Sequence, residues 1–254
     1  MVEEKKCYYV NEDTGGKTTN FNKGIGWLLE NSKGIGGLIA TLTIRNMESC
    51  ASYPGMTALI KLVKNNPHRA WIDGVELELI TESRIPYNGK NRPLLAVHPT
   101  KKFLDKVYAI KNISQMMVVP WVNDEIKEWK EYSNAREYGA TNTKKTNSTV
   151  NSIVLNALED MTQIMNLANG MVHPRNVDIV IETFQILHRN GEKLDKEEVK
   201  TYLIKYLKWD PILAEEASDL VHKVKEGKRH KFITGMHWNE NIITEWRKRS
   251  STFA

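Results

Sequence analysis

The chain has 254 residues, of which 41% are hydrophobic and 26% are charged, and this balance argues against a chain that is disordered throughout. Its two cysteines, Cys7 and Cys50, exclude a disulfide framework, and without a CxxC pair they argue against a thiolate zinc site. The net charge is +5, but residues 222–254 hold eight Lys and Arg against three Asp and Glu. The other 221 residues are therefore neutral, and a basic nucleic-acid surface is expected only in the tail.

The first residues, MVEEKK, mix both charges and lead into no apolar segment, so we expect no signal peptide. The most apolar stretch, residues 34–44, is too short to span a bilayer as a helix. We therefore expect a cytoplasmic protein that does not enter a membrane.

Residues 1–133 alternate short apolar runs with amphipathic helical stretches, which is typical of an α/β domain with a mainly parallel sheet. Strands are predicted in 36–44, 93–98 and 115–121, and each is followed by a predicted helix, in 55–65, 99–112 and 122–134. Between them, Asp73-Gly74 separates two strand-like runs and predicts a hairpin. The sheet is therefore expected to be mixed, with helices flanking it.

The stretch 134–151 is polar and almost free of large apolar residues, and it predicts a linker or an exposed loop. Residues 152–254 show helical periodicity throughout, with predicted helix N-caps at Asp195 and Asp210. They predict a helical bundle with a basic C-terminal tail, and this bundle is a candidate module for binding a protein partner or for self-association.

Three glycine-rich stretches resemble phosphate-binding motifs but do not complete them. Gly16-Lys17-Thr18 has the ending of a P-loop, yet the leading glycine is replaced by Asn11, and the two glycines that follow argue against a helix there. We predict a turn built on Gly15 and Gly16. The runs that begin at Gly24 and Gly34 both lack the third glycine of GxGxxG, and we interpret them as the flanks of a buried strand.

The seven histidines form no HxxxH, HExxH or HxH pattern, so no metal and no cofactor are predicted. His230 and His237 are seven residues apart, but Gly235 argues against a helix that would bring them to one face.

Polar side chains follow the three best predicted strands, and in an open parallel sheet the carboxyl ends of the strands are where ligands bind. Those that suit ligand binding are Arg45, Asn46, Thr100, Trp121 and Asn123. Those that suit acid–base catalysis are His98 with Asp124 or Glu48 as its partner. We favour binding of a small phosphorylated or nucleotide-like ligand, and keep an enzyme (a hydrolase or a transferase) at the same place as the alternative. Ordinary helix N-terminal residues would also account for several of these side chains.

The basic tail interleaves Lys and Arg with Phe232, Trp238 and Trp246, a composition that can bind single-stranded nucleic acid. The alternative, which we favour, is a terminal helix whose tryptophans dock on the bundle. The helix pair around Trp209 could also form a helix-turn-helix, but the acidic residues near the start of its second helix would repel phosphate. A nucleic-acid-associated protein acting through residues 222–254 is therefore the weaker alternative.

Overall fold

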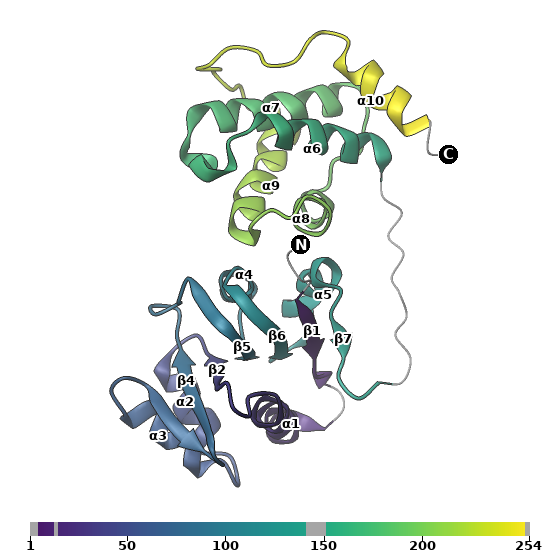
Figure 1. Ribbon diagram of the computed structural model, residues 1–254. Helices are drawn as coiled ribbons and strands as arrows, with labels where there is room; N and C mark the ends of the chain where they lie inside the picture. The colour runs from purple at the N-terminus through teal and green to yellow at the C-terminus, as the bar shows by residue number, and fades with distance from the viewer. Residues whose placement is uncertain (1–4, 13–14, 141–150, 252–254) are drawn as a thin grey trace. The chain divides into compact units, whose positions relative to one another are not determined.

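The computed structural model describes residues 5–12, 15–140 and 151–251. The chain divides into two compact units, Met1–Lys145 and Thr146–Ala254 (Figure 1). The stretch 134–151 that the sequence predicts as a linker spans this division, and its residues 141–150 lie outside the described part of the chain. Within the described ranges, no helix combines the length and the apolar composition needed to cross a membrane.

The first unit is built on a seven-stranded sheet in the order β3-β4-β2-β5-β6-β1-β7. The strands are β1 (Lys6–Tyr9), β2 (Gly37–Ala40), β3 (Arg69–Ile72), β4 (Val75–Ile80), β5 (Asn88–Val97), β6 (Lys111–Val119) and β7 (Arg136–Glu137). Only β3 and β4 pair antiparallel among these neighbours; every other pair is parallel. The predicted mixed, mainly parallel α/β sheet is confirmed. So is the hairpin, in which Asp73 and Gly74 have φ angles of 48° and 77°, as a two-residue hairpin turn requires.

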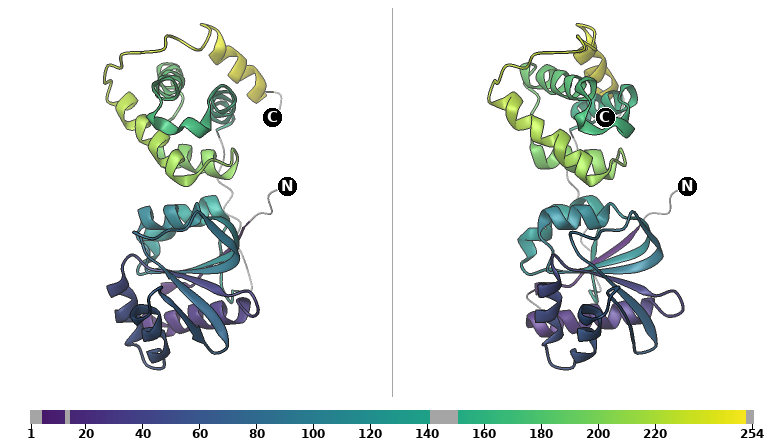
Figure 2. Two further views of the ribbon diagram at one scale, coloured as in Figure 1. Left: turned by 60° about the vertical axis from the view of Figure 1, so that its left-hand side comes forward. Right: turned by 90° about the vertical axis from the view of Figure 1, so that its left-hand side faces the viewer.

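Helices cover both faces of the sheet (Figures 1 and 2). On one face lie α1 (Gly16–Asn31), α2 (Ile44–Ala51) and α3 (Ile60–Lys64), the last preceded by the short helix η2 (Thr57–Leu59). These helices share one apolar cluster with the sheet, in which Phe21, Met47 and Leu62 are fully buried. The other face carries α4 (Lys101–Tyr108), η3 (Asn123–Ile126) and α5 (Lys127–Ser133).

Helix α1 begins at Gly16, so the prediction that no helix follows the Gly15-Gly16 turn is wrong. The run at Gly24 is likewise part of this helix and does not flank a strand. The reason is tertiary packing, which overrides the low helix propensity of glycine. A Cβ atom on Gly24 would lie 2.7 Å from Val119 Cγ2 and 3.0 Å from Leu95 Cδ1, so the glycine lets α1 pack closely against the sheet.

At two points of the carboxyl edge of the sheet, neighbouring strands send the chain to opposite faces. After β1 the chain enters α1 on one face, whereas after the neighbouring β6 it enters η3 and α5 on the other. The same divergence separates β2, followed by α2, from β5, followed by α4. Points at which adjacent strands send their connections to opposite faces are where open α/β sheets bind ligands.

The second unit is helical, as predicted. Its helices are α6 (Ser152–Ile164), η4 (Leu167–Val172), α7 (Pro174–Arg189), α8 (Lys196–Lys205), α9 (Pro211–Lys225) and α10 (Ile242–Ser251). The side chain of Asp195 accepts hydrogen bonds from two backbone N–H groups at the start of α8, and that of Asp210 accepts one at the start of α9, so both predicted N-caps are confirmed.

The segment between α9 and α10 is irregular and is held by two buried carboxylates of α7. Asp178 accepts hydrogen bonds from the backbone N–H groups of Ile233 (2.8 Å) and Thr234 (2.7 Å), and its other oxygen lies 2.6 Å from His230 Nε2. One turn later, Glu182 accepts from the backbone N–H of His237 at 2.8 Å. These bonds lower the pKa of Asp178 to about 2 against the effect of its burial.

Candidate functional site

A hollow of about 240 Å³ lies at the carboxyl ends of β1 and β6. The residues that line it are Glu12, Gly16, Lys17, Asn20, Val119, Pro120 and Trp121. They come from the loop after β1, the start of α1 and the end of β6. The hollow therefore lies at one of the two points where neighbouring strands send the chain to opposite faces.

The amino end of α1 opens into this hollow. Its N-cap residue is Gly15, which offers no side-chain cap, and the first turn holds no acidic residue. The first N–H groups of a helix have no partner within the helix and carry the positive end of its dipole, so they favour an anion. Lys17, in the same turn, adds a full positive charge at the wall of the hollow.

Three asparagines form a bonded group beside that turn. The amide nitrogen of Asn123 donates to Asn11 Oδ1 at 2.9 Å, and that of Asn20 donates to the backbone carbonyls of Asn11 (3.0 Å) and Glu12 (3.3 Å). The two backbone carbonyls fix which way the Asn20 amide points, so its Oδ1 atom is left buried, with no hydrogen-bond partner among the described residues. Asn123 Oδ1 is also buried without such a partner. A buried acceptor without a donor is costly, so it calls for an explanation.

Trp121 forms an aromatic wall at the mouth of the hollow, with 46% of its surface exposed. The ammonium of Lys17 lies over its ring, 3.1 Å from the centroid. The imidazole of His98 meets the same ring edge-on, with the centroids 4.9 Å apart and the planes at 87°. The ring is therefore held in place by contacts from two other elements.

His98 lies between these two points of the sheet, and its backbone adopts a left-handed conformation. It follows β5, its φ angle is 47°, and its N–H donates to the carbonyl of Val119 at 2.7 Å. A non-glycine residue in this left-handed region is strained, and such residues cluster at functional sites. Burial, and secondarily the charge of Lys17, lower the pKa of His98 to about 4, and its Nε2 atom is buried without a partner among the described residues.

The thiol of Cys50 faces this imidazole, with Sγ 4.0 Å from His98 Nδ1. Burial raises the pKa of Cys50 to about 11. At neutral pH the pair is therefore a neutral thiol beside a neutral imidazole, and it lacks the thiolate that a cysteine nucleophile requires.

The structure brings together only part of the predicted site. His98 and Trp121 are in contact, and Asn123 is bonded to Asn11. The remaining predicted residues are exposed: Arg45, Asn46 and Glu48 on α2, Thr100 as the N-cap of α4, and Asp124, which follows Asn123, in η3. Within the described residues no hydrogen bond or ion pair joins His98 to Asp124 or to Glu48.

Four residues of this region were not among the predicted site residues: Asn11, Lys17, Asn20 and Cys50. The available signal for one of them, Lys17, was Gly16-Lys17-Thr18 after a strand, which is phosphate-binding chemistry even without the full P-loop. Nothing in the sequence points to Asn20 or Cys50, because their place depends on how α1 and α2 pack.

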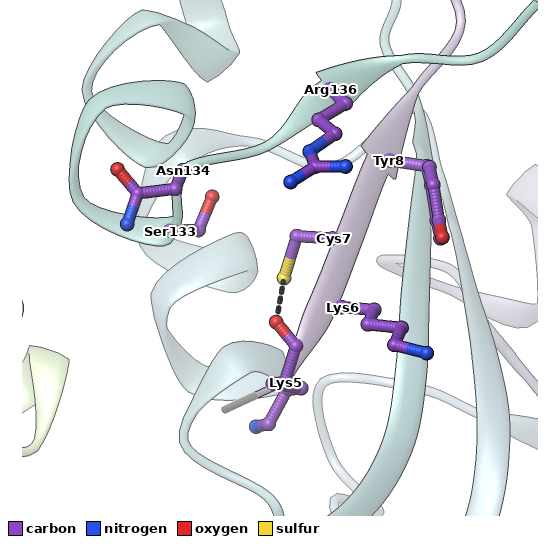
Figure 3. Close-up of a pocket in the computed structure, with 7 residues that line it drawn as sticks. All are labelled: Lys5, Lys6, Cys7, Tyr8, Ser133, Asn134 and Arg136. Atoms are coloured by element: carbon purple, nitrogen blue, oxygen red, sulfur yellow. Dashed lines mark hydrogen bonds between the residues drawn. The ribbon is translucent and has the colours of Figure 1, made fainter. Parts of the chain in front are cut away.

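A second hollow, of about 400 Å³, lies beside β1 and β7 (Figure 3). It is lined by Lys5, Lys6, Cys7, Tyr8, Ser133, Asn134 and Arg136. Its character is cationic, but the ammonium of Lys5 already donates to the carbonyls of Tyr108 (2.6 Å) and Ile110 (3.0 Å). None of its lining residues has a buried polar atom that lacks a partner, so it offers weaker evidence of a ligand than the first hollow.

In the second unit the histidines and tryptophans of the tail are engaged with the bundle. His230 and His237 each face one carboxylate, and across the described residues no group of three or more His, Cys, Asp or Glu side chains is arranged to hold a metal ion. The indole of Trp238 donates to Thr183 at 2.9 Å, and that of the fully buried Trp246 donates to Asp160 at 2.9 Å. These rings pack on the bundle, as the favoured interpretation of the tail requires.

Comparison with known proteins reaches only this second unit. Residues 150–247 match the model of a family described as a domain of unknown function (DUF1889). No curated protein and no solved structure matches the chain. The match covers α6 to α9 and most of α10, and it includes none of the residues around the crevice.

Proposed function

We propose that the first unit binds a small phosphorylated ligand in the crevice between the carboxyl ends of β1 and β6. The observation that carries this proposal is the meeting of two features in one hollow. The amino end of α1, whose N-cap Gly15 has no side chain to cap it, offers positive charge together with Lys17, and the buried amide oxygen of Asn20, which also lines the hollow, has no partner among the described residues. A ligand with an anionic group and hydroxyl donors satisfies both features.

The enzyme alternative has less support. His98 faces a neutral thiol and an indole, not the carboxylate of Asp124 or Glu48 that would orient it as an acid or a base. Binding without turnover therefore accounts for more of the geometry.

The test is calorimetric titration of the full chain with ribose 5-phosphate, with neutral ribose as the comparison. Binding of the phosphate and not of ribose supports the proposal. Lys17→Ala should weaken binding by about 1.5 to 3 kcal/mol, the usual contribution of a hydrogen bond to a charged group. Lys23→Ala is the matched control, since Lys23 is exposed on the same helix but does not line the hollow. Equal losses in the two variants would show a general charge effect and would contradict the site.

A further inference from the structure

We infer that the ligand is a nucleoside monophosphate whose base stacks on the ring of Trp121 while its phosphate lies at the first turn of α1. This inference rests on the proposed function and names the chemical class of its ligand. It is carried by the position of Trp121, by the ammonium that covers its ring and by the buried amide oxygen of Asn20.

Trp121 is a large aromatic side chain that is both exposed and held rigidly. Its backbone follows Pro120 and the fully buried Val119, and the edge-on contact with His98 fixes the plane of its ring. Trp71, another exposed tryptophan, lies on the edge strand β3 and lines neither hollow. A fixed aromatic plane at the mouth of a polar hollow suits a planar heteroaromatic ring, because every nucleobase offers a π-face for stacking.

Lys17 connects the two ends of such a ligand. Its ammonium lies over the ring of Trp121, and no carboxylate among the described residues pairs with it. Its Cα belongs to the first turn of α1, so the same side chain reaches a phosphate bound there. A phosphate at the helix end would draw the ammonium off the indole, and the exposed face would then be free for the base. One residue thus exchanges a cation–π contact for a charge-assisted hydrogen bond.

The amide oxygen of Asn20 accounts for the middle of the ligand. Asn20 lines the hollow and is 4% exposed, and its nitrogen is already bonded to two carbonyls, so its Oδ1 atom is an acceptor without a donor among the described residues. Acceptors require donors, and the hydroxyl groups of a ribose lie between the phosphate and the base. The size of the hollow, about 240 Å³, is below the usual range for ligand sites, so it leaves room for one nucleotide with its base at the mouth and not for a dinucleotide.

The test compares adenosine 5′-monophosphate with ribose 5-phosphate by calorimetry on the full chain. The nucleotide should bind at least about fivefold more tightly, the lower limit expected when one base stacks on an aromatic ring. Trp121→Leu should abolish this preference, so that the variant binds the nucleotide and ribose 5-phosphate with equal affinity. Trp71→Leu is the matched control and should keep the preference. Loss of the hydroxyl donors, in 2′,3′-dideoxyadenosine 5′-monophosphate, should weaken binding to the unchanged protein.

Two results would overturn the inference, and they can be told apart. Equal affinity for the nucleotide and the sugar phosphate in the unchanged protein, with both weakened by Lys17→Ala, would refute base stacking and leave the phosphate site standing. Absence of binding by every phosphorylated compound would refute the site itself. Because the comparison of the two ligands uses the unchanged protein, a folding defect in Trp121→Leu would not prevent a decision.

Discussion

The Nδ1 atom of His98 lies 4.0 Å from the Sγ atom of Cys50, across the gap between the carboxyl ends of β5 and β2. The imidazole is thus enclosed by a thiol from α2 and an indole that follows β6, and no carboxylate among the described residues bonds to it. Burial, more than the charge of Lys17, lowers the pKa of His98 to about 4. The residue that the sequence marks as an acid or base is therefore neutral under physiological conditions.

This environment predicts the titration of His98 directly. Its imidazole resonances should titrate with a midpoint near pH 4 in a two-dimensional NMR experiment on the folded protein. Since this pKa is below that of an unfolded histidine, about 6.5, the unfolded chain takes up the proton first. The contribution of His98 to stability is then complete above about pH 6.5 and is lost as the pH falls towards 4. A midpoint near 6.5 would contradict the burial and the contact with Cys50.

The close packing of α1 on the sheet predicts opposite effects for two neighbouring glycines. Gly24→Ala places a methyl group 2.7 Å from Val119 Cγ2 and should destabilise the protein by about 1 to 2 kcal/mol, since overpacking exceeds the gain in helix propensity. Gly26 has nothing within 4 Å of the added atom, so Gly26→Ala should stabilise by about 0.5 to 1 kcal/mol. Denaturant unfolding of the two variants measures the change in the free energy of unfolding. A change of the same sign in both would contradict the close packing of α1 on the sheet.

These glycines also show why the sequence reveals only part of the fold. The alternating strands and helices can be predicted from local hydrophobic periodicity, and the Asp73-Gly74 turn can be predicted from its residue pair. Helix α1 is not, because four glycines between residues 15 and 26 lower its propensity. Burial of its apolar face against the sheet, which the small size of Gly24 allows, compensates.

The same limit applies to the site. Polar residues after strands can be found in the sequence, and His98, Trp121 and Asn123 were found in this way. Which of them meet depends on strand order: β1 lies beside β6, so Lys17 reaches Trp121 although they are distant in the chain. Without knowledge of that order, Asp124 and Glu48 were predicted as carboxylate partners of His98, because they also follow predicted strands.

The irregular segment between α9 and α10 should depend on Asp178. Asp178→Ala removes the acceptor for two backbone N–H groups and leaves His230 without its partner. The free energy of unfolding of the second unit should therefore fall by about 3 kcal/mol. The amides of Ile233 and Thr234 should lose their protection in hydrogen exchange. Glu216→Ala, an exposed residue of α9, is the control and should change stability by less than about 0.5 kcal/mol.

The pH dependence of this contact has a definite sign. The pKa of Asp178, about 2 in the folded protein, is lower than the usual 3.8. The carboxylate therefore contributes its full stability above about pH 4, and the contribution is lost as the pH falls through 2. Amides of Ile233 and Thr234 that remained protected in Asp178→Ala would show that other contacts hold the segment.

The central claim is that the crevice at the amino end of α1 binds a phosphorylated ligand. The most direct measurement is titration of the ¹⁵N-labelled full chain with adenosine 5′-monophosphate, followed by backbone, side-chain amide and indole resonances. The account predicts saturable shifts at the backbone N–H groups of Gly16 and Lys17, at the side-chain amides of Asn20 and Asn123, and at the Trp121 indole. Shifts confined to Lys6, Tyr8 and Arg136, or no shifts at all, would contradict it.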